Sequence, residues 1–399
     1  MADPRPRVRS DVANRIPVSP RLASRLGDDP CCRAAPAIRS AAQGTACGSD
    51  FGSDTAKRRI DHVRDLRAAY RADLGSGSIM IELYVSYLSP YSSKIMALLG
   101  YSEIPHRIVV ETIVNRFSVL KRLTGKTMVP MLRNGDLALN DSTRIARLIL
   151  AQVGADEMTS PFLAWLIEDF ADEWIVRWFA QARWSLPENR SSMERRIGAE
   201  MFPGILSTKG GNLAAKTIHD NLKRAGVLER IESLERSRDR TFAILEELFS
   251  DGLYVFGGQP TVADFALYGF LWQFGNDPLG APVVAGFPNT WRFVERVHAW
   301  TTGSGEVSTA RRPLAELRPL IGEILGTYWR LLAANDELKP GESVELTLID
   351  GTSIDVRASR WAKSCFEALK AEAVAAQAAT GRYCDDESLN QAISAALAK

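Results

Sequence analysis

Apolar residues follow two different periods in consecutive parts of the chain. Over residues 78–154, short apolar runs alternate with stretches of helical period, which predicts an α/β domain. The expected elements are a strand at 79–85, a helix after it, a strand at 107–110, a helix, a β-hairpin of 131–132 with 137–139 about the turn Asn134-Gly135, and a helix at 143–150. After residue 154 the strand-like pattern stops and does not return before residue 309.

Residues 155–308 have a helical period throughout and are expected to form an all-helical domain. Ser160-Pro161 opens a long helix to about residue 185, because serine caps a helix and proline suits its first position. This helix carries an aromatic stripe, which is either core packing or the wall of an apolar pocket: Phe162, Trp165, Phe170, Trp174, Trp178 and Phe179. Further helices are expected at 189–200, 212–225, 227–249, 261–274 and 288–301.

A third region, residues 309–399, mixes both patterns and predicts a small α+β extension. One helix is expected over 312–334, and others over 359–378 and 386–398. Between them, two alternating runs flank Asp350-Gly351, a strong hairpin signal.

The first 77 residues show no apolar period and are expected to be a disordered or weakly helical leader, with one charged helix at 54–73. They hold 14 Lys and Arg against 9 Asp, whereas the rest of the chain has 35 against 39. Gly75-Ser76-Gly77 marks the expected boundary, so a chain that begins at Ser78 should keep the fold.

Composition places the protein among ordinary globular chains. Of its 399 residues 46% are hydrophobic and 24% charged, and the net charge of +1 gives no global basic field of the kind that gathers nucleic acid. The five cysteines lack metal-ligand spacing and fit a reducing compartment. No apolar run is long enough for a membrane span, so a cytoplasmic protein is expected.

Three short motifs between residues 79 and 149 carry the candidate chemistry: Ser89-Pro90-Tyr91-Ser92, Val129-Pro130 and Asp141-Ser142. Ser89 follows a strand and starts a helix, where its hydroxyl either caps free amides or donates to a bound thiolate that the helix dipole also favours. Asp141-Ser142 likewise opens a helix, and either caps it or holds an anion at its N-terminus.

The order and spacing of these motifs resemble the glutathione-binding half of the glutathione transferase family, a variant of the thioredoxin fold. In that resemblance, Ser89 takes the position of the residue that activates the glutathione thiol, and Tyr87 is an alternative hydroxyl. Pro130 is expected to be cis, so that the backbone of Val129 pairs with the glutathione peptide.

The resemblance also assigns the third motif and a signature in the helical half. Ser142 is expected to hold the γ-glutamyl carboxylate, and Asp141, where Glu or Gln is usual, to face the ammonium group. Thr261 and Asp264 lie in the segment 257–265, which is similar to a family signature and forms a capping box of structural meaning.

The resemblance implies an enzyme that binds glutathione as co-substrate, ionises its thiol and directs it at a small apolar electrophile or peroxide, with conjugation and detoxification as the common outcome. No metal, nucleic acid or membrane is expected to take part, and a homodimer is left open. The alternative is a non-catalytic binding or scaffold protein with the same fold, favoured by Asp141 and by the extension at 309–399.

Overall fold

The computed structural model describes residues 80–153, 160–224, 228 and 232–398. The leader, its expected helix at 54–73 and the boundary at Ser78 lie outside these residues. The first described elements form a mixed four-stranded sheet in the order β2-β1-β3-β4. Its strands are β1 (Ile81–Val85), β2 (His106–Val110), β3 (Met131–Asn134) and β4 (Leu137–Asn140). β2 runs parallel to β1 and β3 antiparallel to it, as the expected β-α-β unit and hairpin require.

Helices α2 (Pro90–Tyr101) and α5 (Ser142–Val153) pack against each other and bury their apolar residues with those of the sheet. The connection from β2 to β3 contains three short helical segments: α3 (Ile113–Asn115), η3 (Arg116–Leu120) and α4 (Lys121–Thr124). The hairpin turn lies one residue later than expected. Asn134 pairs with Leu137, which leaves Gly135 and Asp136 as the turn, and Gly135 supplies the left-handed backbone (φ 57°).

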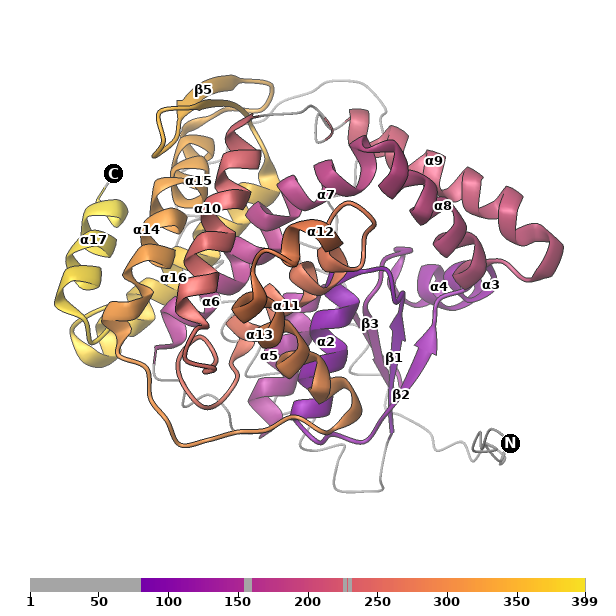
Figure 1. Cartoon of the computed structure of the whole chain (residues 1–399), viewed down its shortest axis with the longest axis horizontal. Helices are drawn as coiled ribbons and strands as arrows, with labels where there is room; N and C mark the ends of the chain where they lie inside the picture. Colours follow the sequence, from indigo (N-terminus) through magenta and orange to yellow (C-terminus); the bar gives the residue numbers. More distant parts are fainter. Residues whose placement is uncertain (1–79, 154–159, 225–227, 229–231, 399) are drawn as a thin grey trace, which may run out of the picture. The chain divides into compact units, whose positions relative to one another are not determined.

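The next described segments are all helical. The long helix expected from Ser160 is one run with a π-helical segment in its middle: α6 (Pro161–Phe170), η4 (Ala171–Ile175) and α7 (Val176–Ser185). The elements after it are α8 (Pro187–Met201), η5 (Gly204–Leu206), α9 (Ser207–Arg224), α10 (Glu232–Leu248), α11 (Val262–Gly275), α12 (Ala281–Val284), α13 (Pro288–His298) and η6 (Ala299–Thr302). Figure 1 shows α8 and α9 side by side as a helical hairpin, and the two helices are in close contact.

The aromatic stripe is core. The six side chains named for the long helix are all at most 6% exposed and belong to one continuous hydrophobic cluster. The core-packing interpretation is therefore confirmed for these residues.

The C-terminal extension contains η7 (Leu314–Leu317), α14 (Arg318–Gly326), α15 (Tyr328–Glu337), a hairpin of β5 (Ser343–Thr347) and β6 (Ser353–Arg357), α16 (Arg360–Thr380) and α17 (Glu387–Leu397). The prediction of a single helix over 312–334 is wrong, because the helical conformation is interrupted at Thr327 (φ −126°, ψ −81°). The carbonyl of Gly326 accepts a hydrogen bond from the amide of Ile349 (3.1 Å), outside the helix.

The extension shares its core with the helical region. Tyr328 and Tyr383 of the extension lie against Phe170 and Phe162 of α6, and the main hydrophobic cluster reaches from Ile81 to Ile393. An ion pair between Arg147 of α5 and Glu372 of α16 (2.7 Å) also joins the extension to the first domain.

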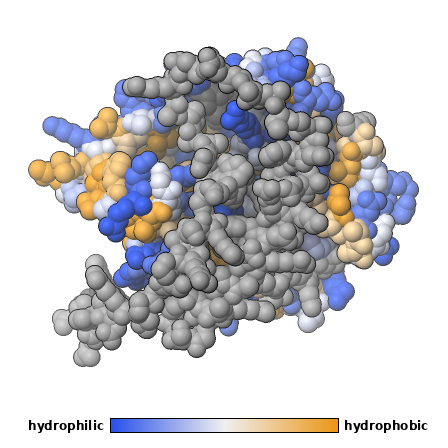
Figure 2. Space-filling model, turned by 180° about the vertical axis from the view of Figure 1, so that it is seen from behind, coloured by the Kyte–Doolittle hydropathy of each residue, from blue (hydrophilic) through white to orange (hydrophobic). Residues whose placement is uncertain are grey.

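Some apolar side chains stay on the surface of the helical hairpin. Ile205, Leu206 and Leu213 are 96%, 56% and 68% exposed. Figure 2 shows apolar residues in orange among hydrophilic ones in blue at the edges of the visible face. Within the described residues, no helix combines the length and the apolar character needed to cross a membrane.

Candidate functional site

Ser89 lies between the end of β1 and the first turn of α2. It is the N-cap of α2, and its Oγ accepts a hydrogen bond from the amide of Ser92 (3.2 Å). Pro90 occupies the first turn, where its missing N–H costs nothing. Among the described residues the Ser89 hydroxyl proton has no acceptor, so the half-buried hydroxyl can still donate to a ligand at the helix N-terminus.

The loop from Ser86 to Ser89 has its backbone groups satisfied by side chains from three helices. The carboxylate of Glu200, on α8, accepts from the amide of Tyr87 (2.8 Å) and from the Ser86 hydroxyl. The Tyr87 carbonyl accepts from Gln273 of α11 (2.7 Å). The next carbonyl, of Leu88, accepts from Arg183 of α7 (2.7 Å). These three bonds to the backbone hold the loop, and with it the Cα of Ser89, in one position.

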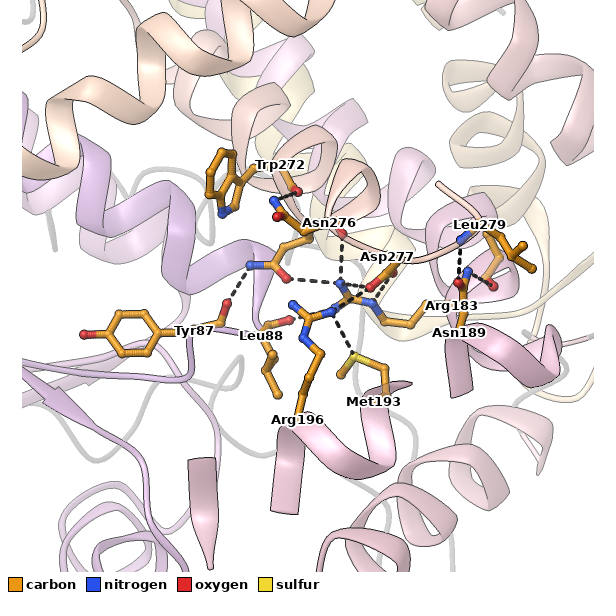
Figure 3. Close-up of polar contacts among 12 residues, drawn as sticks. Tyr87, Leu88, Arg183, Asn189, Met193, Arg196, Trp272, Asn276, Asp277 and Leu279 are labelled. Carbon is orange, nitrogen blue, oxygen red and sulfur yellow. Dashed lines mark hydrogen bonds and ion pairs between the residues drawn. The ribbon is translucent and has the colours of Figure 1, made fainter. Parts of the chain in front are cut away.

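A buried ion-pair network supports this loop (Figure 3). Arg183 makes two hydrogen bonds to the carboxylate of Asp277 (2.7 and 3.0 Å), and Arg196 of α8 adds a third (3.0 Å). Arg183 also donates to the side chain of Gln273 (3.0 Å). Burial lowers the pKa of Arg183 and Asp277 opposes that effect. The guanidinium stays charged, since arginine does not lose its proton in proteins.

Tyr87, the alternative hydroxyl, does not face this network. Tyr87 is 52% exposed, and its ring points away from Arg183 in Figure 3. Ser89 is therefore the better-placed hydroxyl for a ligand at the start of α2.

The second motif has the expected backbone. The peptide bond between Val129 and Pro130 is cis, and Pro130 is buried directly before β3. Asn140 fixes the approach to this bond by donating to the carbonyl of Met128 (2.8 Å). In the described part of the chain, the amide and carbonyl of Val129 make no hydrogen bond, which leaves both groups available to an extended peptide.

The third motif caps α5. Asp141 has a left-handed backbone (φ 84°), and its Oδ1 accepts from the amides of Thr143 (3.0 Å) and Arg144 (3.3 Å). Such strain in a non-glycine residue is typical of functional sites. The Ser142 hydroxyl is buried and donates to Asp172 of η4 (3.1 Å). Its one proton is thus engaged in the absence of a ligand.

Beneath these motifs lies a buried charge cluster that joins α2 to α6 and η4. Lys94 is fully buried and pairs with Glu168 (2.5 Å) and Asp172 (2.7 Å). Burial alone would lower the pKa of Lys94, but the two carboxylates outweigh it and raise the pKa. Burial raises the pKa of Asp172 to about 7, against the opposing effect of Lys94. The Ser142 hydroxyl completes the cluster.

Sequence reasoning did not find Lys94, Glu168, Asp172, Arg183 or Glu200. A signal existed for Glu168 and Asp172, since they are charged residues four apart within the aromatic stripe and so face the core. No local pattern pointed to Arg183 or Glu200. No group of His, Cys, Asp and Glu side chains suited to a metal ion occurs among the described residues.

Two family models match the chain. The model of the glutathione S-transferase N-terminal domain matches residues 83–157, and that of the glutathione S-transferase C-terminal domain matches residues 229–296. A thioredoxin-like domain that is followed by this helical domain defines a glutathione S-transferase fold. Residues 83–157 and 229–296 are therefore glutathione S-transferase N-terminal and C-terminal domains, and the expected fold class and family are confirmed for them. The extension at 309–399 and the hairpin of α8 and α9 lie outside the matched residues.

A search of curated proteins gave no match. Solved structures with a likeness to this chain include glutathione S-transferase III in apo form (17% identity, 59% of this chain and 100% of that chain, TM-score 0.37). The β-etherase LigF from Sphingobium sp. strain SYK-6 has 16% identity over 55% of this chain and 96% of its own, with a TM-score of 0.38. A glutathione transferase family member from Pseudomonas fluorescens Pf-5, with two glutathione bound, has 17% identity, 58% and 95% coverage and a TM-score of 0.37.

Proposed function

We propose that this protein is a glutathione transferase in which Ser89 ionises the thiol of bound glutathione for attack on a small apolar electrophile or peroxide. The single observation that carries the proposal is the Ser89 hydroxyl at the N-terminus of α2, with its proton free of any described acceptor. The backbone of Val129 supports it, because its amide and carbonyl have no partner among the described residues and can pair with the peptide of glutathione.

The energies suit this role. A hydrogen bond to a charged group stabilises it by about 1.5–3 kcal/mol. One pKa unit corresponds to about 1.36 kcal/mol, so such a bond lowers the pKa of a thiol from about 8.5 to roughly 7. The thiolate fraction at neutral pH then rises from a few per cent to about half. The thiolate is the form that attacks an electrophile.

Binding of the γ-glutamyl group is assigned to the start of α5. The amide of Ser142 and the helix dipole favour the carboxylate, and Asp141 faces the ammonium. The Ser142 hydroxyl joins them only if it exchanges its bond to Asp172 for one to the ligand. This competition is the specific reason to keep the second candidate, a scaffold protein that has lost turnover.

The Ser89→Ala variant tests the proposal. Thiolate absorbance of bound glutathione at pH 7 should fall from about half of the ligand to a few per cent, while affinity changes little. Ser118→Ala is the matched control, because Ser118 is a serine of the same domain whose hydroxyl donates to the carbonyl of Val114 (2.8 Å), within its own helical segment. Thiolate absorbance that persists in Ser89→Ala would refute the role of Ser89, and Tyr87→Phe would then be examined.

A glutathione column and a panel of electrophiles and peroxides separate the two candidates. Retention of the parent with turnover of any panel compound supports the enzyme. Retention with no turnover supports the scaffold.

A further inference from the structure

The hairpin of α8 and α9 reaches the loop that carries Ser89. Its last helical turn before Met201 presents Glu200, whose two carboxylate oxygens each accept one hydrogen bond from the loop. Oε1 accepts from the Ser86 hydroxyl and Oε2 from the amide of Tyr87 (2.8 Å). The Ser86 hydroxyl oxygen in turn accepts from the amide of Leu88 (3.2 Å).

The same loop is joined to the hairpin by apolar contact. Leu88 packs against a hydrophobic cluster built from α7, α8 and α9, whose buried members are Ala180, Trp184, Met193, Ile197, Met201 and Ala215. Arg196 of α8 ties the hairpin to Asp277 after α11. The position of Glu200 is therefore determined by packing on both sides.

We propose that Glu200 is a positioning residue: its carboxylate holds the Ser86–Leu88 loop so that the Ser89 hydroxyl points at the glutathione thiol. This inference rests on the proposed function. It gives the hairpin, which neither family model covers, a part in thiol activation. Glu200 acts through the loop and does not touch glutathione in this scheme.

The contacts explain why a carboxylate is needed at this position. Both partners, the Ser86 hydroxyl and the Tyr87 amide, are donors, so two acceptor oxygens are required. Glutamine has one oxygen and an amino group that is itself a donor. In one orientation of a glutamine side chain the Tyr87 amide faces the amino group and loses its acceptor. In the other, the Ser86 hydroxyl must accept from the amino group and turn its own proton away. Both orientations replace the two charge-assisted bonds of the loop with at most weaker neutral ones.

One positive and one negative side chain lie near enough to Glu200 to affect its charge. Arg196 lies on the same helix and stabilises the carboxylate, whereas Glu111, after β2, repels it and is itself paired with Arg116 (2.6 Å). Burial raises the pKa of Glu200, and its bonds to Ser86 and Tyr87 act in the opposite direction. The two loop donors thus offset part of the effect of burial, and the pKa of Glu200 stays above its ordinary value.

The effect of Glu200→Gln on the glutathione thiol separates positioning from simple electrostatics. Removal of a nearby negative charge would, by Coulomb's law alone, lower the thiol pKa and increase thiolate absorbance. Loss of the loop geometry would weaken the bond from Ser89, raise the thiol pKa and decrease the absorbance. The two explanations predict opposite signs.

We expect Glu200→Gln to lower the thiolate fraction and kcat by about tenfold, and to change the KM for glutathione by less than about threefold. Glu194→Gln is the control, since Glu194 lies on the same helix and, among the described side chains, forms its one ion pair with Arg190 at 3.9 Å. A thiolate fraction in Glu200→Gln that equals or exceeds that of the parent would overturn the inference.

A second measurement needs no glutathione. Hydrogen exchange of the peptide that spans residues 84–94 should become faster in Glu200→Gln and stay unchanged in Glu194→Gln, because the Tyr87 amide loses its bond to a charged carboxylate. Equal exchange in the parent and Glu200→Gln would refute the loop contact. If the parent binds no glutathione, the proposed function fails, while the exchange result still decides whether Glu200 holds the loop.

Discussion

Replacement of Lys94 by methionine tests the buried charge cluster. The ammonium group of Lys94 is inaccessible to solvent and contacts two carboxylates, of Glu168 (2.5 Å) and Asp172 (2.7 Å), which are themselves 1% and 4% exposed. Methionine fills a similar volume but leaves two buried carboxylates without their cation. Breaking a buried pair in this way typically destabilises a protein by about 3–5 kcal/mol.

Such a loss corresponds to a fall in melting temperature of about 6–20 °C for a domain of 150–250 residues. The loss should also grow with pH. Without Lys94, the folded-state pKa of Asp172 rises further above its unfolded value than the present value of about 7. When the pKa of a carboxyl group is higher in the folded than in the unfolded state, the free energy of unfolding falls as the pH rises between these two values. Between pH 7 and pH 8 the variant should therefore lose about 1 kcal/mol more of this free energy than the parent.

The assay is a thermal melt followed by circular dichroism at pH 7 and pH 8. Lys216→Met is the control, because Lys216 pairs with Asp220 at the same 2.5 Å but its side chain is 71% exposed. It should melt within about 2 °C of the parent, since exposed pairs contribute little. Melting of Lys94→Met within that same interval at both pH values would refute the reasoning. The triple variant with Glu168→Gln and Asp172→Asn should recover much of the loss.

Three further outcomes are expected. Ser142→Ala should weaken glutathione binding by about 1–3 kcal/mol, and equal affinities by calorimetry would argue against the assigned carboxylate site. Asp264→Ala should destabilise the fold by about 2 kcal/mol or more in urea titration, because the buried carboxylate accepts from the amides of Val255 (2.7 Å) and Thr261 (2.8 Å). A chain that ends at Ser308 should be poorly soluble and bind a hydrophobic dye, since it exposes the apolar surface of α6 that the extension covers; a soluble, cooperatively melting product would show that the extension is dispensable.

Features that depend on neighbouring residues could be predicted from the sequence. Ser89 caps α2, and Thr261 with Asp264 forms the expected capping box, because both devices need only a few consecutive residues. The hairpin of β5 and β6 forms about Asp350-Gly351 for the same reason.

The supports of the site could not be predicted, because they join residues far apart in the chain. Glu200 is 114 residues from Ser86, and Lys94 is 78 residues from Asp172. Periodicity tells which face of a helix is buried, but it does not tell which charged side chain on α8 meets which loop. The break at Thr327 escaped prediction in a similar way, since it depends on the contact between Gly326 and Ile349.

The contact of α5 and α6 with the last helices has a consequence during synthesis. Arg147 is synthesised 225 residues before Glu372, its partner in the ion pair. At a translation rate of about 5–20 residues per second, this takes about 11–45 seconds. During that time the aromatic face of α6, with Phe162 and Phe170, has left the ribosome without the extension that buries it. We therefore expect the nascent chain to be prone to aggregation during this time, and the yield of folded protein to depend on chaperones that bind exposed aromatic segments.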